Sequence, residues 1–329
     1  MDIWDWFSDN EKLLSGLAAA LVIIGAFATV GRNFFLQIII SLGSKPSKKV
    51  TLSDLSSPSP HTIQFANSDG VNIAYTVFGK SSPDLVVTPG IISNIHVSSN
   101  LKPLRETMNA LSKFCRVINF DKRGQGLSDP VANASSLAER VKDIGAVANA
   151  ANIEKFVLMG ISEGGPMSIK FAVDNPNKVA GLILFGTTAR FSRADDYAIG
   201  ISEQSLDGLA DLWGTASARD ILFPSITRDE IDDETYKGME MLLADKRSMK
   251  QIVEYMKTFD VRDLLSQVAC PTLIVHFSGD LAVPARMGRY LANGILNSEY
   301  LEIAGVDHCD LAQAPDGIKR IKEFVRDCS

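Results

Sequence analysis

The chain has 329 residues, of which 46% are apolar and 22% are charged, and its formal net charge is −6. This length accommodates one large domain or two small ones, and the acidic balance argues against a nucleic-acid-binding protein. The cysteines show neither metal-ligand spacing nor the pattern of a disulfide scaffold, so we expect free thiols, no metal and no cofactor. The four cysteines are Cys115, Cys270, Cys309 and Cys328.

An uncharged apolar segment runs from Leu13 to Gly31. Nineteen helical residues span roughly 28 Å, which is close to the hydrocarbon core of a bilayer. Lysine and arginine are more frequent after this segment than before it, so the positive-inside rule places the rest of the chain in the cytoplasm. We therefore expect residues 1–43 to form a transmembrane or membrane-associated helix with lipid as a partner. The small residues Gly16, Ala20 and Gly25 would allow two such helices to pack in a homodimer.

Two other interpretations of this segment stay open. A signal peptide cleaved near Ala26-Phe-Ala28 is one, although the preceding residues are acidic rather than basic. A helix buried against the protein itself or against a partner is the other. Residues 44–60 are rich in Ser, Pro and Lys, and this composition predicts a linker to a globular body at residues 61–329.

From residue 61 onwards, short apolar runs alternate with patterns typical of helices. Two β-type runs flank the turn signal Asn67 to Gly70 and predict an antiparallel hairpin. Further strands are predicted at Asp84–Thr88, Cys115–Phe120, Phe156–Met159, Val179–Phe185, Thr272–His276 and Tyr300–Ile303. Helices are predicted at Leu101–Phe114, at Ser136–Ala151, after Ser162 and at the C-terminal end. This alternation predicts an α/β fold whose mostly parallel sheet carries helices on both faces.

The strand pattern stops between Gly186 and about Asp263, where only helical runs occur. We expect this insertion after the sixth strand, about residues 187–263, to form a cap over the carboxyl ends of the strands. Ligands bind at those ends in open α/β sheets. Its methionines either line an adaptable pocket or pack in the core.

The pentapeptide Gly160-Ile-Ser162-Glu-Gly164 stands between a predicted buried strand and a predicted helix. In this context a G-x-S-x-G turn lifts a serine hydroxyl to the top of a sheet, and the glycines leave room for a tight reversal. We expect Ser162 to be a nucleophile. The backbone N–H of Glu163, at the start of the helix, is expected to hold an oxyanion.

A serine nucleophile needs a base, and the base needs an acid to orient it. His308 follows the last predicted strand and is the expected base, whereas His61, His96 and His276 are not assigned this role. Asp280 lies in the turn after the penultimate strand and is the expected acid. The chain order Ser162, Asp280, His308 is the order of this type of triad.

The second oxyanion donor is expected in the loop after the third strand, and we assign it to the backbone N–H of Ile91. Three polar residues in the glycine-punctuated loop after the fourth strand are interpreted as a structural brace for the site. They are Asp121, Arg123 and Asp129.

Together these motifs resemble the α/β-hydrolase superfamily over roughly residues 61–329. The likeness is closest to hydrolase-like domains that are fused in some bacteria to class III adenylate/guanylate cyclases. It is carried by the stretches 87–94, 120–129, 160–167, 213–215, 278–280 and 305–308. The resemblance implies an eight-stranded sheet, the triad roles and an esterase activity. Pro89 departs from the family, because many relatives carry histidine before the oxyanion-hole glycine.

The sequence therefore predicts a membrane-anchored serine hydrolase that cleaves small carboxylic esters with an apolar acyl or alcohol group. Thioesterase, lipase, perhydrolase and C–C hydrolase activities stay open. The alternative from a different class is a catalytically silent hydrolase fold that acts as a sensor or interaction module at the membrane.

Overall fold

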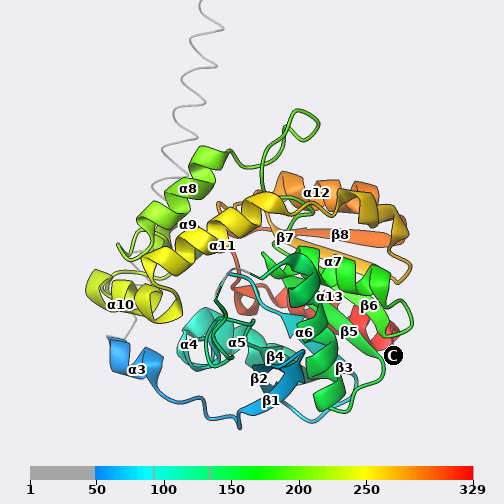
Figure 1. Ribbon diagram of the computed structural model, residues 1–329, viewed down its shortest axis with the longest axis horizontal. Coiled ribbons are helices and arrows are strands. Elements are labelled where there is room, and N and C mark those ends of the chain that lie inside the picture. The colour runs from blue at the N-terminus through cyan, green and yellow to red at the C-terminus, as the bar shows by residue number, and fades with distance from the viewer. Residues whose placement is uncertain (1–48, 92, 133–134, 329) are drawn as a thin grey trace, which may run out of the picture. The chain divides into compact units, whose positions relative to one another are not determined.

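A computed structural model describes residues 49–91, 93–132 and 135–328. At its centre lies one eight-stranded sheet with the strand order β1-β2-β4-β3-β5-β6-β7-β8 (Figure 1). Strands β1 and β2 form the antiparallel hairpin, β2 pairs antiparallel with β4, and every pair from β4 to β8 is parallel. The predicted mostly parallel eight-stranded sheet is confirmed.

The strands are β1 (Gln64–Ser68), β2 (Val71–Phe78), β3 (Asp84–Thr88), β4 (Arg116–Phe120), β5 (Phe156–Ile161), β6 (Val179–Phe185), β7 (Thr272–Phe277) and β8 (Ser298–Ile303). The middle strands are continuous apolar runs, and every residue of β5 and β7 is buried. Such runs are expected where helices cover both faces of a parallel sheet. Because the carboxyl ends of these strands share one edge, the loops that follow β3, β5, β7 and β8 meet there.

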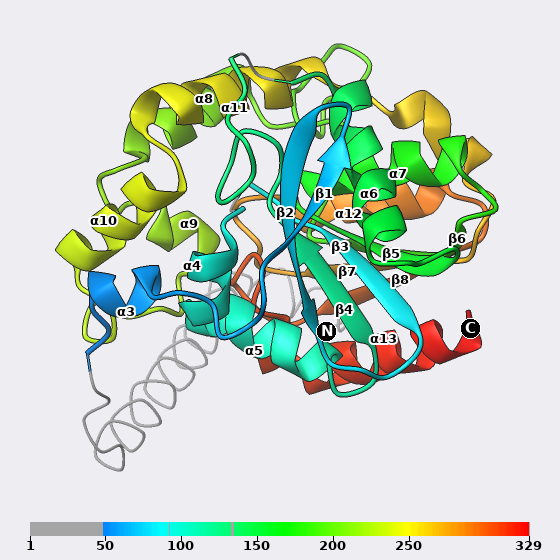
Figure 2. The ribbon, with the colours of Figure 1, turned by 60° about the horizontal axis from the view of Figure 1, so that its bottom comes forward.

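Helices cover both faces of the sheet. They are α4 (Ile95–Asn100), α5 (Lys102–Leu111), α6 (Leu137–Ala150), α7 (Gly164–Asp174), α12 (Ala285–Gly294) and α13 (Pro315–Asp327). Helices α5 and α13 lie on one face, whereas α6, α7 and α12 lie on the other (Figure 2). Two of these helices, α4 and α12, were not predicted from the sequence.

The cap insertion consists of α8 (Glu203–Leu212), α9 (Arg219–Leu222), α10 (Asp233–Leu243) and α11 (Lys246–Thr258), followed by the 3₁₀ helix η1 (Arg262–Gln267). Of its methionines, Met239 and Met249 are buried in the core, Met241 is exposed, and Met256 lines a cavity that reaches Ser162. Core packing therefore describes Met239, Met249 and Met256, and Met256 also contributes to the wall of that cavity.

Residues 49–60 differ from the expected linker. They contain helix α3 (Leu52–Ser56), whose capping box joins Thr51 and Asp54 and whose Leu55 is buried. The Lys49 ammonium lies 2.9 Å from the Asp232 carboxylate at the start of α10. Burial of Leu55 and the hydrogen bond from the Val50 N–H to the Glu230 carbonyl oxygen (3.0 Å) also hold this segment on the body.

The predicted anchor at residues 1–43 lies outside the described residues. Over the ranges that the structure covers, no helix combines the length and the apolar character needed to cross a bilayer.

Candidate active site

Ser162 occupies a strained turn between β5 and α7. Its φ of 51° lies in the left-handed region, which is rare for residues other than glycine. A Cβ at Gly164 would lie 2.3 Å from the Thr88 carbonyl oxygen, and one at Gly160 would lie 2.7 Å from the Ser168 hydroxyl. Both positions therefore require glycine for the close approach that the sequence predicted.

Asp280 and His308 are joined by a hydrogen bond. Nδ1 of His308 lies 2.7 Å from Oδ2 of Asp280, and both side chains are buried. The other carboxylate oxygen of Asp280 accepts hydrogen bonds of 2.9 Å from the backbone N–H groups of Ala282 and Val283. The loops after β7 and β8 thus hold the acid and the imidazole in a fixed relation.

The hydroxyl of Ser162 and the ring of His308 line the same two cavities. Nε2 of His308 is buried and has no hydrogen-bond partner, so the hydrogen bond to Ser162 is not formed in this structure. Catalytic hydrogen bonds are often long or poorly aligned before substrate binds. The structure brings the three predicted residues to one site and leaves Nε2 of His308 without a partner.

The charge of Asp280 shifts the titration of His308. Burial lowers the pKa of His308, but the Asp280 carboxylate, with a further contribution from the Cys309 thiol, outweighs burial and holds this pKa well above 6.5. His308 therefore becomes neutral at a higher pH than a free imidazole does.

Two backbone N–H groups near Ser162 are candidates for an oxyanion hole. A Cβ at Gly90 would lie 2.8 Å from Cβ of Ser162, so the loop after β3 packs directly against the serine. The N–H groups of Ile91 and Glu163 have no protein acceptor in the described part of the chain. Amides left unpaired beside a nucleophile are suited to an oxyanion.

The side chain of Glu163 is held by two buried cations that sequence reasoning missed. Its carboxylate pairs with Lys122 and, at 3.0 Å, with Arg140. Burial raises the pKa of Glu163, but these cations outweigh burial and lower it, so the carboxylate is charged. Burial also lowers the pKa of Lys122 to about 8. This clamp fixes the side chain of the residue that directly follows Ser162.

The loop after β4 braces the site as expected. One carboxylate oxygen of Asp121 accepts hydrogen bonds from the N–H groups of Ile95 (3.1 Å) and Leu127 (2.8 Å). Arg123 pairs with Asp143 of α6 at 2.6 Å. Burial raises the pKa of Asp121 to about 7, with the two N–H groups opposing the shift.

The other histidines have structural partners. His61 packs on Phe78, and His96 accepts a hydrogen bond from the Ser59 N–H. His276 is buried, its Nε2 lies 2.6 Å from the Val283 carbonyl oxygen, and burial lowers its pKa. No group of three or more potential metal ligands occurs among the residues that the structure describes.

Two cavities meet at Ser162 and His308. The inner cavity is narrow, runs beneath α5, and is lined by Gly90, Leu104, Met108 and Phe223 among others. The outer cavity, with a volume of about 320 Å³, lies under α8 and is lined by Arg193, Leu206, Leu209 and Arg286 among others.

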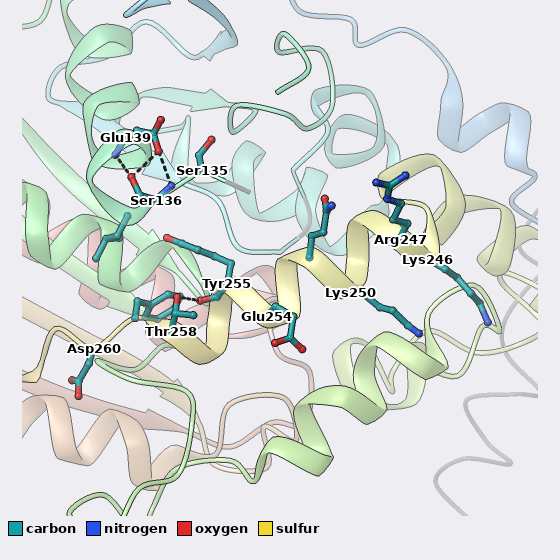
Figure 3. Close-up of a pocket in the computed structure, with 13 residues that line it drawn as sticks. Ser135, Ser136, Glu139, Lys246, Arg247, Lys250, Glu254, Tyr255, Thr258 and Asp260 are labelled. Carbon is teal, nitrogen blue, oxygen red and sulfur yellow. Dashed lines mark hydrogen bonds between the residues drawn. The ribbon is translucent and has the colours of Figure 1, made fainter. Parts of the chain in front are cut away.

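A larger and more open hollow, of about 1,100 Å³, lies between α11 and the start of α6 (Figure 3). Its walls include Glu139, Lys250 and Tyr255 but none of the three triad residues. The ring of Tyr255 lies under the Arg140 guanidinium at 4.0 Å and so separates this hollow from the Glu163 clamp. Its size alone does not make it the reaction site.

Known proteins resemble this chain in sequence and in structure. The model of the family described as serine aminopeptidase, S33 matches residues 104–309. The 3-oxoadipate enol-lactonase 1 of Acinetobacter baylyi is 24% identical, over 78% of this chain and 93% of the relative.

Two solved structures share the fold. An esterase from Exiguobacterium antarcticum has a TM-score of 0.67 and 22% identity, and the match covers 80% of this chain and 97% of the esterase. A structure described as a membrane phospholipase A has a TM-score of 0.63 and 16% identity, and that match covers 97% of this chain and 99% of the other.

Proposed function

We propose that this chain, which belongs to the serine aminopeptidase S33 family and is an enzyme of the α/β-hydrolase superfamily, hydrolyses small carboxylic esters. The observation that carries the proposal is the buried Asp280–His308 pair, whose unpartnered Nε2 lines the same cavities as the hydroxyl of Ser162. The enol-lactonase and esterase likenesses support an ester or lactone substrate.

The proposed reaction has two half-steps. Oγ of Ser162 attacks the ester carbonyl while Nε2 of His308 takes its proton, and the N–H groups of Ile91 and Glu163 hold the oxyanion. The C–O bond then breaks, and His308 returns the proton to the leaving alkoxide. Water then attacks the acyl-enzyme while His308 takes its proton, and this second half-step releases the acid and restores Ser162.

Kinetics with full-length protein in a nonionic detergent test the proposal. We expect turnover of 4-nitrophenyl acetate and butyrate that is lost in Ser162→Ala. Alanine 4-nitroanilide serves as a comparison, because the family description names an aminopeptidase. Faster turnover of the anilide than of either ester would contradict the ester assignment.

One second candidate is a catalytically silent sensor or interaction module, which would not need the Ser162–His308 hydrogen bond that is not formed in this structure. The same assay separates the two. Ester turnover by the wild type that does not exceed that of Ser162→Ala would support the silent module.

Membrane anchoring by residues 1–43 is a further part of the proposal. It is supported by the uncharged segment Leu13 to Gly31 and by the likeness to a membrane phospholipase A. Carbonate washing of membranes followed by immunoblotting tests it. Full extraction of the protein into the supernatant would contradict a spanning helix.

A further inference from the structure

The charged residues of the outer cavity are of one sign. Its lining includes Arg193 and Arg286 and no aspartate or glutamate. The same cavity reaches Ser162 and His308, so a substrate bound there places its ester within the field of two guanidinium groups. A cavity lined by one sign of charge with apolar walls concentrates ligands of the opposite sign.

The two arginines are fixed on one turn. Nε of Arg193 donates to the carbonyl oxygen of Gly200 (3.3 Å), and Nε of Arg286 donates to that of Ile199 (2.9 Å). These carbonyls belong to consecutive residues, so a segment after β6 and the first turn of α12 are both held on one turn at the wall of the same cavity. Residues 193 and 286 are far apart in the chain, so only the fold creates this pair.

Neither arginine has an ion-pair partner in the described part of the chain. Their neighbours behave differently, since Arg190 and Arg262 both pair with Asp260. With Nε engaged by a backbone carbonyl, each of the two arginines keeps its terminal NH₂ groups for another acceptor. Both side chains are exposed and line the same cavity, and guanidinium NH₂ groups bind the oxygens of a carboxylate or phosphate.

The N-terminus of helix α8 lies at this cavity, and its first-turn Glu203 is exposed to solvent and is not among the lining residues. Ser202 caps α8, accepts a hydrogen bond from the Ser205 N–H (3.1 Å), and lines the cavity together with Ser205. The N-terminus of a helix carries a partial positive charge. The apolar side chains of Leu206 and Leu209 stand on the same helix, so the cavity offers an apolar wall beside its cationic end.

We propose that the substrate ester carries an anionic oxygen group, a carboxylate or a phosphate, which Arg193 and Arg286 bind while the ester carbonyl lies at Ser162. This inference rests on the proposed hydrolase function and adds the charge of the substrate to it. The two arginines are specificity-determining residues that contact the substrate but take no part in proton transfer.

Two matched pairs of soluble esters test the inference. One pair is mono-4-nitrophenyl glutarate and 4-nitrophenyl valerate, which differ by a carboxylate on the acyl side. The other is 1-butyrylglycerol 3-phosphate and 1-butyrylglycerol, which differ by a phosphate on the alcohol side. Each kcat/KM is divided by the rate constant for hydroxide-catalysed hydrolysis of the same ester, so that intrinsic reactivity cancels.

We expect the full-length enzyme in nonionic detergent to prefer the charged member of at least one pair by about tenfold or more, mainly through KM. The pair that shows the preference identifies the anion and its side of the ester. Arg193→Gln and Arg286→Gln should each remove most of this preference, chiefly by raising KM for the charged ester. Arg289→Gln is the matched control, because Arg289 is also exposed on α12 but pairs with Glu302 at 2.7 Å. It should keep the preference.

Equal normalised kcat/KM values within both pairs, or a preference that survives both substitutions, would overturn the inference while leaving the hydrolase function intact. Calorimetric binding to the Ser162→Ala protein gives a readout without turnover. We expect 1-butyrylglycerol 3-phosphate or glutarate monomethyl ester to bind more tightly than its neutral counterpart, and we expect the arginine variants to lose this difference in affinity. That result supports the inference even if no ester is hydrolysed. Equal binding of charged and neutral compounds contradicts it.

Discussion

Replacement of Asp280 by asparagine tests how the buried pair works. Asparagine keeps the shape of the side chain and can still accept the 2.9 Å hydrogen bonds from Ala282 and Val283. Its NH₂ group would then face Nδ1 of His308 at the position of an oxygen that now lies 2.7 Å away. Because an NH₂ group donates, Nδ1 must accept, and the ring proton moves to Nε2.

An imidazole protonated at Nε2 cannot take the proton of Ser162. We therefore expect kcat for 4-nitrophenyl butyrate to fall by about 10⁴-fold, which corresponds to about 5.4 kcal/mol in activation free energy. In the wild type, activity should rise with pH as His308 loses its proton, with a midpoint above 6.5 because the pKa of His308 is raised. Loss of the Asp280 charge should move the midpoint of the residual activity to lower pH.

Circular dichroism and a fluorescence melt of Asp280→Asn should match those of the wild type, which shows that the loss is catalytic. A loss of kcat smaller than tenfold, or a midpoint that does not move, would refute the assignment of Asp280 as the partner of the base.

Two further predictions concern the support of the site. Lys122→Met leaves the buried Glu163 carboxylate with Arg140 as its only cation, so the free energy of unfolding in urea should fall by about 3–5 kcal/mol. Adding Glu163→Gln to this variant removes the unpaired charge and should recover part of the lost stability. A fall below 1 kcal/mol would show that the clamp is not needed for stability. Gly164→Ala places a Cβ against the Thr88 carbonyl oxygen and should lower kcat by about 100-fold or more. Gly208→Ala is the control, because a Cβ there meets no atom within 4 Å, and it should leave kcat unchanged. Equal activity of both glycine variants would contradict this account of the turn.

Local patterns were sufficient to predict the strands and the three candidate site residues. Ser162, Asp280 and His308 each lie within five residues after the end of a predicted strand, β5, β7 and β8 ending at Ile161, Phe277 and Ile303. Parallel strands bring such ends to one edge of the sheet. Helix α4 was missed because it is only six residues long, and its signal is the single cap of Asn94. Helix α3 was missed because serine and proline dominate the composition around Leu55.

Interactions between distant segments could not be predicted in the same way. Lys122 and Arg140 are ordinary charged residues in the sequence, and only the folded chain buries both against Glu163. Arg193 and Arg286 line one cavity because of how the cap and α12 are placed, and α12 was not predicted from the sequence. The raised pKa of His308 likewise arises from a carboxylate that the fold, rather than the local sequence, places beside it.

Covalent labelling tests the central claim most directly. The full-length protein is treated with a fluorophosphonate, digested, and its modified peptide is identified by mass spectrometry. The account predicts one phosphonylated residue, Ser162, with labelling abolished in Ser162→Ala and strongly slowed in Asp280→Asn. A label on another residue, or labelling that persists without the Ser162 hydroxyl, would contradict the assignment of this serine as the nucleophile.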